Sequence, residues 1–147
     1  MSTPVNSLDQ MHALGRSLGA RLKAGDILLL NGTLGAGKTS LVQGIGEALG
    51  ISGVTSPTFV ISRTYHAAIP LIHVDAYRLV GEPWALFDDL DLESQVPDSI
   101  TVIEWGDGFV ERIADEFLEV KLEFGEGDDQ RLLTAIPHGP RWQGFTL

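Results

Sequence analysis

The stretch that decides the fold is Ile27-Leu28-Leu29-Leu30-Asn31-Gly32-Thr33-Leu34-Gly35-Ala36-Gly37-Lys38-Thr39. Its first part is a short, continuous apolar run, which is typical of a parallel strand covered on both faces. Its second part fits the pattern G-x-x-x-x-G-K-[ST], whose glycines let successive backbone N–H groups turn inward around phosphates. Apolar residues then recur at helical spacing as far as Gly50, which is placed to end a helix. The stretch therefore predicts a strand, a phosphate-binding loop and a helix.

The loop and the first helical turn supply the predicted nucleotide contacts. Successive amides and the positive end of the helix surround the phosphates, Lys38 adds a point charge near the β- and γ-phosphates, and the Thr39 hydroxyl can ligate Mg²⁺. The predicted phosphate-binding residues are Gly32, Leu34, Gly35, Ala36, Gly37, Lys38, Thr39 and Ser40. The residues alone leave ATP and GTP open, although the chain has no N-K-x-D guanine motif.

Two acids are candidates for the carboxylate that a P-loop enzyme needs at its magnesium ion. Asp75 lies in 71–77, where side chains alternate by face, so that His73, Asp75 and Tyr77 share one face. Glu104 ends the apolar run 100–103. Packing alone explains such a strand-end acid poorly, but either acid could instead be structural, paired with Arg78 or a backbone amide.

A third cluster is Thr55-Ser56-Pro57-Thr58. Its hydroxyls suit a switch segment beside a γ-phosphate or its attacking water, and Thr58 is the predicted contact. A polar turn before a strand explains the same residues equally well. His73 by itself fits a satisfied histidine on a half-buried face, and the four histidines lack metal-ligand spacing.

The fold class predicted is α/β: a P-loop NTPase-like domain with a mixed, largely parallel central sheet flanked by helices. Ser7 is placed to cap a first helix, strands are expected at 58–65, 71–75 and 100–103, and 84–92 is helical or irregular. Strands at 117–124 and 131–136 form a late antiparallel pair around the turn 125–130. We predict one domain over residues 1–147, with 1–6 and 137–147 as irregular tails.

Composition narrows the function classes. The chain has 147 residues, no Cys and a formal net charge of −10, and most of its twenty acids lie from Asp88 onward. An acidic surface repels phosphate backbones, so strong direct binding to nucleic acid is not expected. No stretch suits a signal peptide or a membrane span, and the composition predicts a cytoplasmic protein.

Two rival functions fit a P-loop domain of this size. A small-molecule kinase would bring a lid with clustered arginines, but the seven arginines here are scattered along the chain. A nucleotide-gated binding module without significant turnover differs from a slow ATPase in rate more than in structure. Because no evident arginine finger is present, hydrolysis by the chain alone should be slow.

Together these motifs resemble those of the TsaE family. The resemblance covers the P-loop through Ser40, then Thr-Ser-Pro-Thr-Phe (55–59), His-Val-Asp-Ala-Tyr-Arg-Leu (73–79) and Ile-Glu-Trp (103–105), in order, spacing and total length. It implies a slow Mg²⁺-dependent ATPase that supports threonylcarbamoylation of adenosine 37 in tRNAs reading ANN codons. It also implies action on the TsaD–TsaB complex, which itself transfers the group.

The resemblance assigns roles to particular residues. It implies that Thr39 and Glu104 hold magnesium, that Asp75 acts near the water or the switch, and that Met11 and Arg131 approach the nucleotide. Lys38, Asp75 and Glu104 are thus the predicted catalytic set. Two departures concern base contacts and the hydrolysis rate: Thr33 replaces a common Asp, and Met11 replaces a common Thr.

Overall fold

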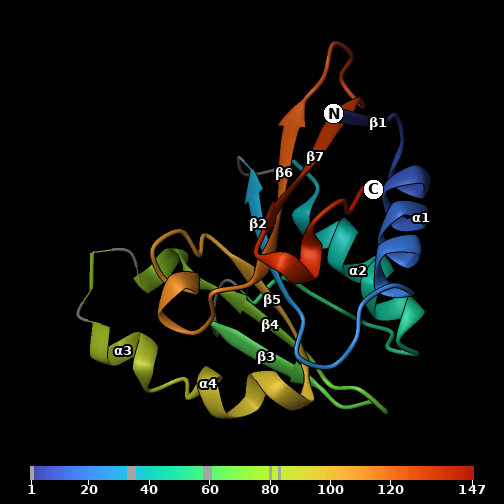
Figure 1. Ribbon diagram of the computed structural model, residues 1–147. Coiled ribbons are helices and arrows are strands. Elements are labelled where there is room, and N and C mark those ends of the chain that lie inside the picture. Colours follow the sequence, from blue (N-terminus) through green and yellow to red (C-terminus); the bar gives the residue numbers. More distant parts are fainter. Residues whose placement is uncertain (1, 33–35, 58–60, 80, 83) are drawn as a thin grey trace.

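A mixed β-sheet forms the centre of the molecule (Figure 1). The computed structural model describes residues 2–32, 36–57, 61–79, 81–82 and 84–147. Within them the sheet has seven strands in the order β1-β7-β6-β2-β5-β4-β3. The strands are β1 Ser2–Val5, β2 Ile27–Gly32, β3 Ser62–Tyr65, β4 Leu71–Asp75, β5 Ile100–Glu104, β6 Phe117–Phe124 and β7 Arg131–His138. The α-helices are α1 Leu8–Gly19, α2 Lys38–Ala48, α3 Trp84–Asp88 and α4 Leu92–Gln95.

The middle of the sheet is parallel and its edges are antiparallel. β2 pairs in parallel with β5 and β6, and β5 pairs in parallel with β4. β7 pairs antiparallel with β6 and β1, and β3 pairs antiparallel with β4. The mixed, largely parallel sheet and the late antiparallel pair are therefore confirmed. The predicted strand 58–65 begins at Ser62 among the residues that can be described.

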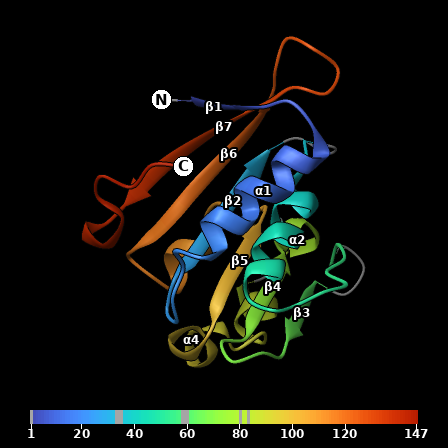
Figure 2. The same ribbon diagram turned by 90° about the vertical axis from the view of Figure 1, so that its right-hand side faces the viewer.

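Two apolar cores cover the two faces of β2, which explains its continuous apolar run. Leu28 and Leu30 face α1 and α2, whereas Ile27 and Leu29 face the core that includes α4 and a 3₁₀ helix at Val110–Arg112. Figure 2 shows α1 lying along α2 over one face of the sheet. Each face of the strand is thus buried, as a central parallel strand requires.

Glycines let the two long helices approach closely. A Cβ on Gly44 would lie 2.4 Å from the carbonyl oxygen of His12, and a Cβ on Gly15 would lie 2.4 Å from that of Leu41. Gly44 costs α2 about 1 kcal/mol of helix propensity. The close packing of α1 on α2 that this glycine permits offsets that cost. Ser7 caps α1 as predicted, because its hydroxyl accepts a hydrogen bond from the Gln10 amide at 3.1 Å.

The prediction of irregular chain ends is wrong for residues 2–5, and at the other end it holds only for the residues that follow Trp142. Residues 2–5 form β1, an edge strand on which Pro4 is tolerated because one side of the strand needs no ladder partner. At the other end β7 runs to His138, and a 3₁₀ helix at Pro140–Trp142 follows. Trp142 is only 1% exposed, and Arg141 pairs with the buried Asp26 at 2.9 Å. Contacts with residues distant in the sequence order these segments. Their own sequences carry no periodic pattern that would predict this order.

No helix in the described ranges has both the length and the apolar character needed to cross a membrane.

Candidate functional site

The predicted strand, loop and helix lie around one turn of the chain. β2 ends at Gly32, α2 begins at Lys38, and Gly37 caps the helix with a φ of 102°, which favours glycine. A Cβ on Gly32 would lie 2.8 Å from the carbonyl oxygen of Leu122 on β6, so this glycine permits close strand packing. The predicted contacts Leu34 and Gly35, and the departure at Thr33, lie outside the described residues.

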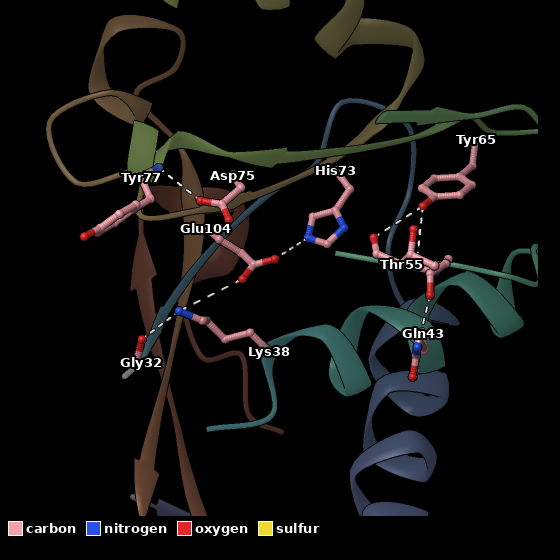
Figure 3. Close-up of polar contacts among 10 residues, drawn as sticks. Gly32, Lys38, Gln43, Thr55, Tyr65, His73, Asp75, Tyr77 and Glu104 are labelled. Atoms are coloured by element: carbon pink, nitrogen blue, oxygen red, sulfur yellow. Dashed lines mark hydrogen bonds and ion pairs between the residues drawn. The ribbon is translucent and has the colours of Figure 1, made fainter. Parts of the chain in front are cut away.

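Lys38 lies at the centre of a polar cluster (Figure 3). Its Nζ donates to the carbonyl oxygen of Gly32 at 2.7 Å and lies 4.0 Å from Oε1 of Glu104. It also lies 4.6 Å from the ring centroid of Trp105, within the range of a cation–π contact. Burial lowers the pKa of Lys38 from its ordinary 10.5, and the carboxylates of Glu104 and Asp75 oppose that shift. The ammonium group is thus poorly solvated and placed to gain from a phosphate.

Both candidate carboxylates lie beside Lys38. Asp75 ends β4, Glu104 ends β5, and the two residues are paired in register across the parallel strands. Their exposed fractions are 5% and 4%. Asp75 accepts a hydrogen bond from the Tyr77 amide at 3.0 Å. The carboxyl ends of adjacent parallel strands thus place both acids at one edge of the sheet, where ligands of α/β folds bind.

His73 is fully buried, which corrects the expectation of a half-buried face. Its Nε2 lies 2.5 Å from Oε2 of Glu104. The alternation within β4 placed His73 on the same face as Asp75, but nothing in the sequence sets the register between β4 and β5. The contact with Glu104 therefore emerges only from the fold.

Trp105 also lies at the site, although the sequence analysis predicted no function for it. Its φ is 57°, in the left-handed region that bulky residues rarely adopt. The turn leaves the indole 37% exposed, over Lys38 and edge-on to Tyr77 at 5.0 Å between centroids. The strained backbone thus places an aromatic face beside the lysine.

Thr55, at the start of the hydroxyl cluster, lies apart from the lysine. The Thr55 amide donates to the Tyr65 hydroxyl at 3.1 Å, and the Gln43 amide group donates to the carbonyl oxygen of Val54 at 3.0 Å. Figure 3 shows Thr55 on the far side of His73 from Lys38. Thr58 lies outside the described residues. The part of the cluster that is described is therefore anchored to α2 and β3.

Four further predicted contacts gather around one cavity. This cavity of about 200 Å³ brings together Met11 of α1, Gly37 and Ser40 of the loop and α2, and Arg131 of β7. Met11 packs against the loop, because a Cβ on Gly37 would lie 3.0 Å from its Cε. The Arg131 guanidinium donates to the carbonyl oxygen of Asp128 at 2.8 Å and stacks over Phe124. The structure thus brings Met11 and Arg131, which the resemblance assigns to the nucleotide, to one cavity beside the start of α2.

The oxygen donors suit magnesium better than a soft metal. The hydroxyl of Thr39 and the carboxylates of Asp75 and Glu104 are hard ligands, of the kind that Mg²⁺ takes together with substrate phosphates. The described residues include no group of three or more His, Cys, Asp or Glu side chains that could hold a metal ion. A few carboxylates beside a phosphate loop are the expected arrangement, since Mg²⁺ is seldom held by an all-protein cage.

The fold and this site together define the P-loop class of nucleotide-binding proteins. The family model "Threonylcarbamoyl adenosine biosynthesis protein TsaE" matches residues 5–133. The chain belongs to the TsaE family.

Individual relatives agree with that assignment. The tRNA threonylcarbamoyladenosine biosynthesis protein TsaE of Streptomyces coelicolor is 46% identical over 139 residues, which cover 90% of this chain and 93% of that protein. The protein of the same name from Bacillus subtilis is 35% identical, over 92% of this chain and 84% of its own. The crystal structure of Bacillus subtilis YdiB matches with a TM-score of 0.79 and 30% identity, over 97% of this chain and 88% of that one.

Proposed function

We propose that this chain binds ATP with Mg²⁺ and hydrolyses it slowly, in support of threonylcarbamoylation of adenosine 37 in tRNAs reading ANN codons. On this proposal it acts on the TsaD–TsaB complex and does not transfer the group itself. The observation that carries the proposal is the convergence of Lys38, Asp75 and Glu104 behind the phosphate loop. Names of relatives tie the family to the tRNA modification.

Different residues of the chain have different roles in the proposed hydrolysis. The loop amides and Lys38 bind the phosphates and stabilise the charge that develops on them. Asp75 orients the water that attacks the γ-phosphorus, and the bond from that phosphorus to the β,γ-bridging oxygen breaks to give ADP and phosphate. The exposed Trp105 partly shields Lys38 from solvent.

Thr39 and Glu104 are the residues that would hold Mg²⁺, Glu104 directly or through water. When bound, the ion neutralises charge on the β- and γ-phosphate oxygens. Thr39 follows Lys38 at the start of α2, and Glu104 already lies 4.0 Å from Nζ of Lys38. The two ligands therefore come from elements that the fold holds together.

The described arginines favour hydrolysis over a kinase reaction. Arg16 pairs with Glu47, Arg112 with Asp88 and Arg141 with Asp26. Each of these three guanidinium groups is already held by an acid of the chain, so the three do not form a cluster of free arginines. Within the part of the chain that the structure describes, these pairs suit transfer of the phosphoryl group to water, with any further cation supplied by a partner.

The test combines turnover with complex formation. Purified protein is assayed for ATP hydrolysis alone and with TsaD–TsaB, and a pull-down is repeated with and without ATP. We expect slow hydrolysis that the complex accelerates, and capture that depends on nucleotide, with Lys38→Ala as the inactive control. Failure of TsaD–TsaB both to bind the chain and to raise its rate would refute the partner assignment. Binding without any turnover would favour the gated module.

A further inference from the structure

The contact between His73 and Glu104 carries more than packing. The imidazole has no exposed surface, and its Nε2 lies 2.5 Å from Oε2 of the carboxylate. An ionised carboxylate only accepts hydrogen bonds, so the proton of this contact lies on Nε2. A buried side chain of β4 thus donates a hydrogen bond to the strand-end acid of β5.

The two oxygens of Glu104 have different surroundings. Oε2 is held by His73, whereas Oε1 faces Nζ of Lys38 at 4.0 Å, on the side of the phosphate loop. A carboxylate held by one oxygen cannot rotate freely about its last bond. The hydrogen bond therefore keeps the second oxygen directed toward Lys38, as Figure 3 shows. Lys38 is the residue that we expect beside the phosphates and their metal.

The second ring nitrogen argues against a purely structural histidine. Nδ1 of His73 is buried and, within the described structure, has no hydrogen-bond partner. Buried polar atoms are nearly always paired, so an unpaired nitrogen makes histidine a poor choice for filling this space. The Nε2 contact is then the reason for the residue type.

We propose that His73 is a positioning residue for the magnesium site: it holds the Glu104 carboxylate in the orientation that binds Mg²⁺. The proposal rests on the proposed function, because it requires Glu104 to serve the metal. Groups that orient a metal ligand typically change metal affinity or activity about 10–100-fold when they are removed. The proposal assigns His73 no contact with the nucleotide.

Three variants of His73 separate positioning from packing. His73→Leu keeps apolar volume and removes the donor. His73→Gln places an amide N–H near the position of Nε2, whereas the shorter His73→Asn places one near Nδ1. The matched control is Thr101→Val on β5, since Thr101 is also buried with an unpaired polar atom and lies on the opposite face of the sheet.

The readout is metal affinity, measured without turnover. Binding of Mn²⁺, followed by electron paramagnetic resonance in the presence of a non-hydrolysable ATP analogue, reports the metal site directly. Affinity for the analogue in EDTA reports the phosphate loop alone. We expect His73→Leu and His73→Asn to weaken metal binding about 10–100-fold, with the affinity in EDTA unchanged. His73→Gln should recover most of the loss, and Thr101→Val should match the wild type.

Several outcomes would overturn the inference. Unchanged metal affinity in His73→Leu, or an equal loss in His73→Gln and His73→Asn, would make the histidine structural. A parallel loss of affinity in EDTA would do the same. If His73→Leu does not fold, the Gln and Asn variants still decide. Failure of the proposed function is seen separately, as a wild-type protein whose analogue binding is indifferent to metal.

Discussion

The two ends of the candidate nucleotide site are built differently. At the phosphate end, Lys38, His73, Asp75 and Glu104 are all at most 6% exposed, and each contacts another group of the cluster or the backbone beside it. At the base end, Ser7 and Asp129 are exposed, and Ser40 and Arg131 are half-buried around a cavity of about 200 Å³. One end is preorganised by burial, whereas the lining of the other end ranges from the buried Met11 to exposed residues at its rim.

The difference follows from what each end must recognise. Buried charges are costly unless they are paired, so a cluster of this kind persists only with fixed partners and fixed geometry. Such a site tolerates little change. A cavity that would contact a flat base through the apolar atoms of Met11 and the guanidinium of Arg131 should tolerate more.

The largest expected effect comes from Lys38→Ala. It removes a cation that the phosphates would contact, and hydrogen bonds to charged groups are each worth about 1.5–3 kcal/mol. We expect affinity for ATP and for inorganic tripolyphosphate to fall by about 100-fold or more, as measured by titration calorimetry. Equal affinities of variant and wild type would mean that the phosphates lie elsewhere.

Variants of the two carboxylates, Glu104 and Asp75, should differ in their Mg²⁺ requirement. Glu104→Gln should lower the hydrolysis rate about 100-fold and raise the Mg²⁺ concentration needed for half-maximal rate. Asp75→Asn should lower the rate by about 100-fold without changing the Mg²⁺ requirement, because it loses the group that orients water. Steady-state rates over a Mg²⁺ series test both variants. An altered Mg²⁺ requirement in Asp75→Asn alone would exchange the two assignments.

The same contrast explains what the sequence could predict. The loop pattern and the strand-end acids are local, so strand β2, helix α2 and the candidates Lys38, Asp75 and Glu104 followed from spacing alone. The contact of His73 with Glu104 depends on the register of two strands that lie about thirty residues apart. No local pattern encodes that register.

The chain ends show the same limit. β1 and the segment around Trp142 owe their order to β7 and to the pair Arg141–Asp26, which are distant in sequence. The prediction of irregular tails failed there because short polar segments with Pro and Gly carry almost no periodic signal.

Smaller pH effects should come from the lowered pKa of Lys38. Between that lowered pKa and 10.5 the nucleotide-free fold has lost a proton that the unfolded chain retains, so its free energy of unfolding should rise with pH. ATP affinity should change in the opposite direction over the same window. Phosphates favour the ammonium form, so binding takes up a proton and weakens as pH rises, by at most about tenfold per pH unit.

Urea unfolding and titration calorimetry over that pH window check the two signs. Lys38→Met serves as the control, because it removes the titrating group and leaves only the background that all other groups contribute. If the difference between the wild type and Lys38→Met did not change with pH, the pKa of Lys38 would not be lowered by folding.

The smallest effect is expected at the base end, from Met11→Thr. A thioether against an aromatic ring is worth about 0.3–1.5 kcal/mol. The small exposed surface of Met11 favours the lower part of that range, or about a two- to threefold loss in ATP affinity. Met11 is only 3% exposed and packs on Gly37, so Met11→Leu, which conserves volume, controls for the packing of the loop. The decisive ligand is tripolyphosphate, which lacks a base.

The affinity for tripolyphosphate should be unchanged in Met11→Thr. In Lys38→Ala, by contrast, the affinity for tripolyphosphate should fall as much as the affinity for ATP. If Met11→Thr weakened both ligands equally, the side chain would act by shaping the loop around Gly37, and the two ends of the site would be one mechanical unit.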